Sequence, residues 1–130
     1  MSLSPCTVLA DINFPTHSIC SSEGGPKEYR ADGLSIPELL DAMLTFMPLD
    51  AYDDHPVQLM DMTDADKAKG MKLSIWEEYS RICNKHQPPA VTLKMVERFE
   101  FYEKAKKAYA IIQTGETAPY ANILLKRGVC

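Results

Sequence analysis

Short apolar runs alternate with amphipathic helical patterns along the chain. The run from Val8 to Ala10 is continuously apolar and is followed by Asp11, Asn13 and Pro15, which is typical of a strand covered on both faces. The alternation of apolar and polar residues after Val91 predicts a strand with unlike faces. Further strands are predicted at 27–31, 57–62, 109–114 and 123–125.

Capping signals mark the starts of two of the predicted helices. Ser35 with Glu38 forms an S-x-x-E capping box, and apolar residues then recur at helical spacing until Pro48 ends the helix. Ser74 with Glu77 forms a second capping box before another amphipathic segment. The apolar stripe of each helix is therefore expected to face a core.

The remaining segments complete an alternation of strands and helices. A helix is predicted from about Phe99 to Ala108, whereas residues 63–70 are predicted to form a charged solvent loop. This alternation indicates an α/β fold, a single layered domain over residues 1–130 with helices packed on a largely parallel or mixed sheet. The two closing strands could be antiparallel neighbours or lie apart, and the sequence favours neither.

Composition excludes several classes of function. The chain has 130 residues and a net charge of −4. It contains no basic run interleaved with aromatic residues, so nucleic-acid binding is not expected. The sequence shows neither a leader nor an apolar run of roughly 20 residues, so no membrane segment is expected. The four cysteines form no C-x-x-C pair, which favours a reduced, cytoplasmic setting without structural zinc. Neither G-x-G-x-x-G nor G-x-x-x-x-G-K-[ST] occurs, so nucleotide binding is not expected.

An acidic residue stands at the end of the first buried strand. Ligands of open α/β sheets tend to bind beyond the carboxyl ends of strands, which makes Asp11 a candidate binding residue. The alternative is that Asp11 caps the following loop by accepting backbone N–H bonds, as Asp commonly does. Spacing alone supports the two interpretations equally.

Several motifs point to one family. The chain carries, in order, VLADINFPTHS (8–18), RADG (30–33), MPLDAY (47–52), ERFEFYEKAKKAYAIIQTGE (97–116) and YANILLKRGV (120–129). Together they resemble the L-fucose mutarotase family, a sibling of the D-ribose pyranases. The resemblance implies a cytoplasmic isomerase that interconverts the anomers of L-fucose, needs no cofactor, and forms homo-oligomers with sites near subunit contacts. D-ribose and related aldoses are further candidate sugars.

The resemblance also assigns binding residues. The family's sugar-binding acids fall on Asp11 and Asp50, its FEFYE tyrosine on Tyr102, and its Y-x-N pair on Tyr120 and Asn122. Carboxylates and amides can hydrogen-bond vicinal hydroxyls, and a buried site built for them rejects sugars that lack the partner group.

Each assignment has a structural alternative. Asp50 could form a turn, Tyr102 could belong to an apolar helical stripe, and Asn122 could serve the entry to a strand. Tyr120 could be a solvent-tipped loop residue. Ala121 stands where the family often has Gly, which costs little unless the backbone requires a positive φ there.

One family feature is missing from the sequence. In the family, a helix and a G-H-G-D turn precede the first strand, and their histidine is the proton donor; here MSLSPC leads directly into the strand, so the domain is expected to be N-terminally shortened. Mutarotation needs two proton-transfer groups. Tyr102, Tyr120 and His17 are therefore the candidate catalytic residues.

Three outcomes remain open at this level. The chain could be a working mutarotase, or a catalytically impaired sugar-binding or regulatory subunit. It could also be an unrelated α/β scaffold or adaptor.

Overall fold

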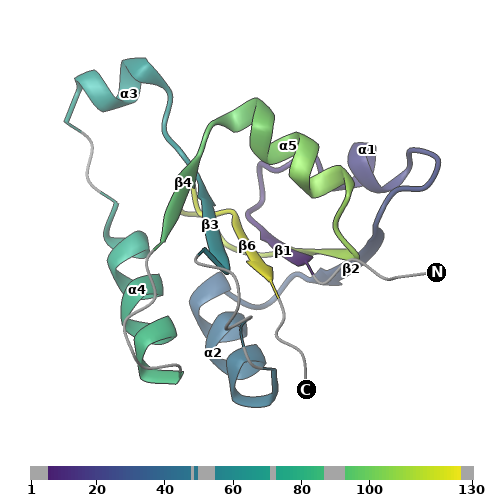
Figure 1. The fold of residues 1–130 in the computed structure, drawn as a ribbon, viewed down its shortest axis with the longest axis horizontal. Helices are drawn as coiled ribbons and strands as arrows, with labels where there is room; N and C mark the ends of the chain where they lie inside the picture. The colour runs from purple at the N-terminus through teal and green to yellow at the C-terminus, as the bar shows by residue number, and fades with distance from the viewer. Residues whose placement is uncertain (1–5, 48, 50–54, 71–72, 87–92, 127–130) are drawn as a thin grey trace.

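Six strands form one mixed sheet in a computed structural model that describes residues 6–47, 49, 55–70, 73–86 and 93–126 (Figure 1). The strands are β1 (Cys6–Ala10), β2 (Lys27–Ala31), β3 (Val57–Met60), β4 (Lys94–Val96), β5 (Ala110–Thr114) and β6 (Ile123–Lys126), and their spatial order is β2-β5-β1-β6-β3-β4. β5 runs parallel to both β1 and β2, and β3 runs parallel to β4. β6 is antiparallel to both of its neighbours, β1 and β3.

Helices cover both faces of this sheet. α1 (Thr16–Cys20) and α5 (Arg98–Lys106) lie on one face, and α2 (Ile36–Phe46) and α4 (Ser74–His86) lie on the other (Figure 1). α3 (Asp64–Ala68) stands apart from both layers, between β3 and α4 in the chain. Among the described residues, no helix is both long and apolar enough to cross a membrane.

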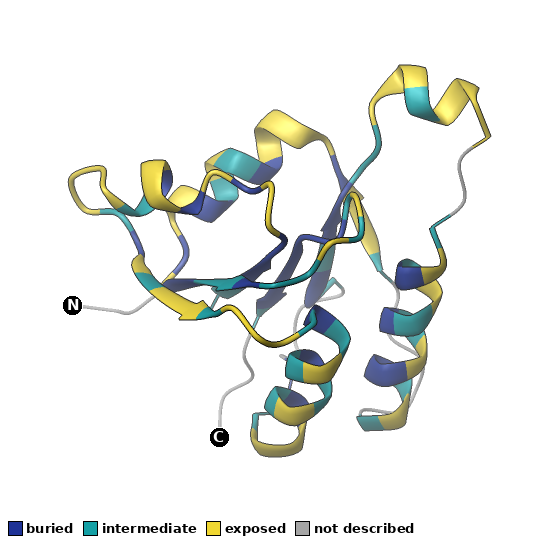
Figure 2. Ribbon diagram, turned by 180° about the vertical axis from the view of Figure 1, so that it is seen from behind, coloured by how far each residue is buried: buried dark blue, intermediate teal, exposed yellow. Residues whose placement is uncertain are grey.

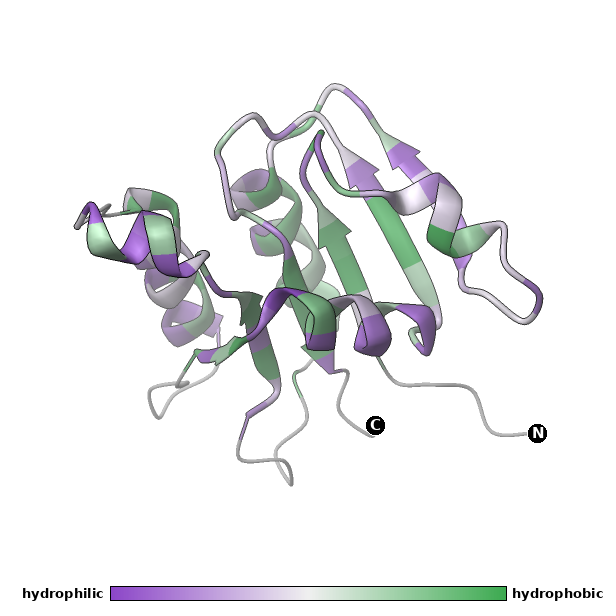
Figure 3. Cartoon of the chain, turned by 90° about the horizontal axis from the view of Figure 1, so that it is seen from above, coloured by the Kyte–Doolittle hydropathy of each residue, from purple (hydrophilic) through white to green (hydrophobic). Residues whose placement is uncertain are grey.

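Alternating side chains of the central strands fill two cores. Leu9 contributes to the core beneath α2 and α4, whereas its neighbours Val8 and Ala10 contribute to the core beneath α1 and α5. Such alternation follows from the two-residue period of a strand. Figure 2 shows the buried residues in the strands and on the helix surfaces that face them, and Figure 3 shows the hydrophobic residues concentrated in the central strands.

The α/β fold and the mixed sheet are confirmed, as is the start of the 35–47 helix. The Ser35 hydroxyl accepts a hydrogen bond from the Glu38 N–H at 3.4 Å, and α2 begins at Ile36. The two closing strands are separated, since β1 lies between β5 and β6. Of the strand predicted after Val91, the described part is the three-residue β4, and Val91 itself lies outside the described residues.

The prediction of a solvent loop at 63–70 is wrong. The segment contains α3, and the Thr63 hydroxyl accepts a hydrogen bond from the Asp66 N–H at 3.3 Å, as an N-cap does. All residues of this helix are at least partly exposed, so no apolar stripe indicated it. Cap chemistry was the available signal, a Thr followed by acids in the first turn.

Candidate functional site

The antiparallel β6 brings two distant polar residues together. Leu9 pairs with Ile123, so the end of β1 meets the beginning of β6, and Asp11 lies beside Asn122. The side-chain oxygen of Asn122 accepts a hydrogen bond from the Asp11 backbone N–H at 2.8 Å. Both residues are buried, with 3% and 4% of their surface exposed. Asn122 therefore anchors the backbone at the point where β1 ends.

The Asp11 carboxylate is held by backbone donors. Its Oδ1 accepts from the Asn13 N–H at 3.0 Å, and its Oδ2 accepts from the Ala121 N–H at 3.3 Å. Burial raises the pKa of Asp11 above its ordinary value and nearby Glu116 adds to the rise, while the backbone N–H groups partly oppose it. Asp11 therefore retains a proton to higher pH than an exposed aspartic acid does.

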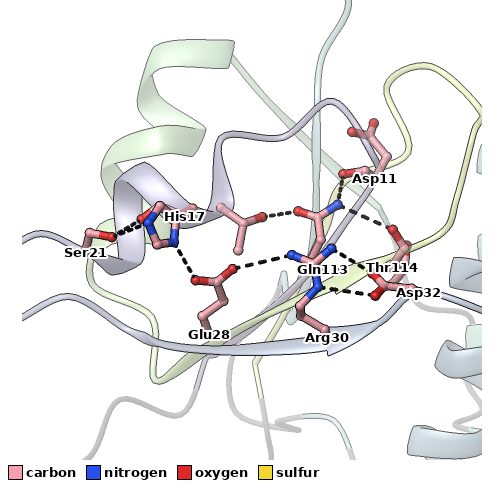
Figure 4. Close-up of polar contacts among 9 residues, drawn as sticks. Asp11, His17, Ser21, Glu28, Arg30, Asp32, Gln113 and Thr114 are labelled. Carbon is pink, nitrogen blue, oxygen red and sulfur yellow. Dashed lines mark hydrogen bonds and ion pairs between the residues drawn. The ribbon is translucent and has the colours of Figure 1, made fainter.

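The amide of Gln113 fixes the turn that follows β1. Its Nε2 donates to the Asp11 carbonyl oxygen at 2.7 Å, and its Oε1 accepts from the Thr16 hydroxyl at 2.5 Å (Figure 4). Because Gln113 lies on β5, the neighbour of β1, this contact ties the turn to the rigid centre of the sheet.

A cavity of about 350 Å³ opens beside Asp11 and Asn122. Its walls come from the ends of β1, β3 and β6, from α3 and from the beginning of α5. The lining residues are Asp11, Asn13, Phe14, Met60, Asp66, Arg98, Tyr102, Pro119, Tyr120 and Asn122. Four residues that the sequence analysis proposed for sugar binding thus line one cavity: Asp11, Tyr102, Tyr120 and Asn122. Asp50, the fifth, lies outside the described residues.

Tyr120 enters the cavity from a constrained backbone. Its φ is +54°, the only positive φ of a non-glycine residue in the described part of the chain. Ala121 thus has no positive φ, and its replacement of the family's glycine introduces no strain there. The Tyr120 hydroxyl donates a hydrogen bond to the Asp66 carboxylate of α3. No sequence pattern indicates Asp66, because the contact joins residues 54 positions apart and residues 63–70 are predicted to form a loop.

Tyr102 forms an aromatic wall of the cavity. Its ring meets Phe14 edge to face, with ring centroids 5.6 Å apart, and meets Phe99 with centroids 6.3 Å apart. Such contacts fix the ring while leaving the phenol partly exposed.

His17 lies outside this cavity. Its imidazole is 85% exposed, and its Nδ1 lies 3.1 Å from the Glu28 carboxylate. It lines a second cavity of about 470 Å³ together with Glu28, Arg30 and Asp32 (Figure 4). Within the described ranges, no three His, Cys, Asp or Glu side chains are grouped as metal ligands.

Known proteins resemble this chain over nearly all its length. Fucose mutarotase of Mus musculus is 52% identical over 126 residues, which cover 93% of this chain and 77% of the mouse protein. A crystal structure of the fucose mutarotase from Streptococcus pneumoniae in complex with L-fucose is 42% identical, with a TM-score of 0.85, and the match covers all of this chain and 86% of that one. RbsD of Bacillus subtilis, solved with D-ribose, shares the fold at 20% identity and a TM-score of 0.69, with coverage of 100% and 86%.

The sequence model of one family matches residues 6–130, a span that contains the cavity and all four of its predicted site residues. That match and the mouse relative at 52% identity confirm the resemblance found in the motifs. The chain belongs to the RbsD/FucU transport protein family.

Proposed function

We propose that this protein is an L-fucose mutarotase, an isomerase that interconverts the α and β anomers of L-fucose by opening and closing the hemiacetal ring. Two fucose mutarotases that are 49–52% identical to this chain support this function, and the matched region covers 77% of each of them. The observation that carries it is the single cavity that gathers Asp11, Tyr102, Tyr120 and Asn122 from both ends of the chain.

The cavity suits a deoxy sugar in size and polarity. Its volume of about 350 Å³ falls in the usual range of small-molecule sites. The Asn122 amide nitrogen has a weak contact with the Met60 sulfur at 3.9 Å, which a sugar hydroxyl can replace. Phe14, Met60 and Pro119 form apolar surface on which the methyl group of a 6-deoxyhexose can pack. L-fucose carries such a methyl group, whereas D-ribose does not.

Ring opening requires the removal of one proton and the addition of another. The Tyr120 oxygen takes the proton of the anomeric hydroxyl while its own phenolic proton passes to Asp66, with which it is hydrogen-bonded. C1 becomes a carbonyl, the bond between C1 and the ring oxygen breaks, and protonated Asp11 gives its proton to the ring oxygen. Each positioned acid or base typically contributes about 10²- to 10⁴-fold.

Ring closure reverses these transfers on the other face of the aldehyde. After rotation about the C1–C2 bond, the hydroxyl attacks C1 and returns its proton to Asp11, while Asp66 and Tyr120 reprotonate the anomeric oxygen. The raised pKa of Asp11 favours this role, since burial increases the fraction that holds a proton. Tyr102 remains a second candidate for proton transfer and for hydroxyl binding.

Exchange NMR tests the function directly. Two-dimensional exchange spectra of L-fucose should show faster interconversion of the anomers with the protein than in buffer. Asp11→Asn and Tyr120→Phe should each lower the added rate by at least about 10²-fold, the lower end of the range for one acid or base. A rate equal to that in buffer would reject the enzyme, and fucose-induced shifts without faster exchange would favour a sugar-binding subunit.

We further propose that the protein acts in the cytoplasm as a homo-oligomer. Cys20 and Cys83 are free thiols, as a reducing compartment favours. The side chains of Phe46 and Phe99 are 88% and 61% exposed, which suits burial against another copy. Cell fractionation and light scattering of the purified protein test these two proposals. Asp50 remains a proposed sugar-binding residue, to be tested by the fucose affinity of Asp50→Asn.

A further inference from the structure

Two side chains of α4 reach the loop that carries Tyr120. The Trp76 indole N–H donates a hydrogen bond to the Tyr120 carbonyl oxygen at 2.8 Å, and the Tyr79 hydroxyl donates to the Ala121 carbonyl oxygen at 2.6 Å. α4 packs on the face of the sheet opposite to Phe14 and Met60, which line the cavity. The loop before β6 is therefore held from behind by a helix that does not itself line the site.

The Trp76 bond and the Asp11 bond meet on a single peptide group. The carbonyl oxygen of Tyr120 and the N–H of Ala121 belong to one planar unit and point in opposite directions. Trp76 binds the oxygen at 2.8 Å, and the N–H donates to the Asp11 carboxylate at 3.3 Å. Rotation of this peptide would break both hydrogen bonds at once.

The backbone that leads into this peptide is strained. Tyr120 has a φ of +54°, a conformation that is unfavourable for a residue with a bulky side chain. A strained residue persists only where its surroundings determine its conformation. Here the surroundings include a donor on the carbonyl of Tyr120, and an acceptor for the N–H that follows it.

We propose that Trp76 is a positioning residue of the active site, which holds the Tyr120–Ala121 peptide so that its N–H meets the Asp11 carboxylate and the Tyr120 ring stays in the cavity. A donor on the carbonyl polarises the peptide and strengthens its N–H as a donor. Trp76 thus stabilises the ionised form of Asp11 through one peptide group. The role in turnover rests on the proposed mutarotase function, whereas the effect on Asp11 does not.

Other groups also act on Asp11 and stay unchanged when Trp76 is replaced. Glu116 raises its pKa, and the Asn13 and Phe14 N–H groups lower it. Arg98 and Asp66 line the same cavity from α5 and α3, as do the phenols of Tyr102 and Tyr120. Burial, and after it Glu116 and Asp11, raises the pKa of the Tyr79 phenol on α4, so this group is uncharged where Asp11 titrates. Because Trp76 is uncharged, Trp76→Phe removes a hydrogen bond and alters no charge around the carboxyl.

The test follows the Asp11 carboxyl by ¹³C NMR as a function of pH, without sugar. Trp76→Phe should raise the pKa of Asp11, because it weakens one of the backbone N–H donors that stabilise the ionised carboxylate. Tyr79→Phe is the matched control. It removes the hydrogen bond to the Ala121 carbonyl oxygen. That carbonyl shares its peptide group with the Asn122 N–H, which is not one of the N–H groups that lower the pKa of Asp11. It should therefore leave the Asp11 titration in place, even where it lowers the melting temperature.

Turnover gives the second readout. Trp76→Phe should lower the fucose exchange rate by about tenfold, because the Tyr120 ring that takes the anomeric proton is held less firmly in the cavity. The pH limb set by Asp11 should move upward with the NMR titration. A folded Trp76→Phe with unchanged Asp11 titration and pH profile overturns the proposal. Should wild type fail to exchange fucose while the titration still shifts in Trp76→Phe, the mutarotase function fails and the positioning role stands.

The wild-type protein provides a measurement should Trp76→Phe fail to fold. Hydrogen exchange of the single indole N–H should be slow, because a bonded and partly buried indole is protected from solvent. Free exchange of that proton in the folded protein would contradict the contact and with it the proposal.

Discussion

Replacement of Asn122 by alanine tests the anchoring of Asp11. The Asn122 oxygen accepts the Asp11 N–H at 2.8 Å, and both residues are almost wholly buried. Asn122→Ala leaves that buried N–H without its acceptor, which should lower the free energy of unfolding by about 1–3 kcal/mol. A loss of 2 kcal/mol in a chain of this size corresponds to a fall in melting temperature of roughly 5–10 °C.

Urea unfolding followed by the fluorescence of the single tryptophan measures this loss. The slope m should stay unchanged, and protomer concentration must be held constant. Asn13→Ala is the control, since it makes the same truncation at an exposed residue and should change stability by less than about 0.5 kcal/mol. Equal stability of Asn122→Ala and Asn13→Ala would refute the anchoring role.

Asn122→Asp extends the same experiment. It keeps an acceptor for the Asp11 N–H but adds a second carboxyl beside the first, and neighbouring like charges raise a pKa. A carboxyl whose folded pKa is raised binds more protons in the native state than in the unfolded state. Stability therefore falls as the pH rises through that pKa. Asn122→Asp should approach wild-type stability in acid and lose it toward neutral pH.

Four further predictions, one of them with a control variant, test other parts of the structure. Asp66→Asn should lower fucose exchange by about 10²-fold or more while stability changes little, and full activity would exclude Asp66 from proton transfer. Because the folded pKa of Asp11 is raised, Asp11 makes the unfolding free energy of wild type fall as the pH rises above 3.8. Asp11→Asn should remove this contribution to the fall. Gly115→Ala should cost about 2–3 kcal/mol, since its Cβ would lie 2.1 Å from a backbone oxygen, whereas Gly33→Ala meets nothing within 4 Å and should be neutral. His17→Gln should leave exchange within twofold of wild type, since the imidazole lies outside the cavity; a large loss would return His17 to the site.

The local signals in the sequence were sufficient for several elements. The capping box at Ser35 predicted the start of α2, because the bond from the Glu38 N–H spans three residues. The apolar run before Asp11 predicted β1 and the position of the acid at its end. Both follow from interactions of neighbouring residues and from the two-residue period of a strand.

Motifs named the residues of the candidate site, and its geometry could not be predicted from the sequence. The resemblance named Asp11, Tyr102, Tyr120 and Asn122, but no local pattern joins residues that lie about a hundred positions apart. Asp66 could not be predicted for the same reason, since its contact with Tyr120 joins α3 to the loop before β6.

The sequence by itself determined the α/β class, most of the strands and the family, because these depend on periodicity, caps and motifs. The tertiary structure decided that β6 lies antiparallel beside β1. It thereby also decided the burial of Asp11, the hydrogen bond between Asn122 and the Asp11 backbone, and the contact of Trp76 with the Tyr120 carbonyl. Strand order is settled by which faces can be buried together across the whole chain, and that is a property of the packed molecule and of no single segment.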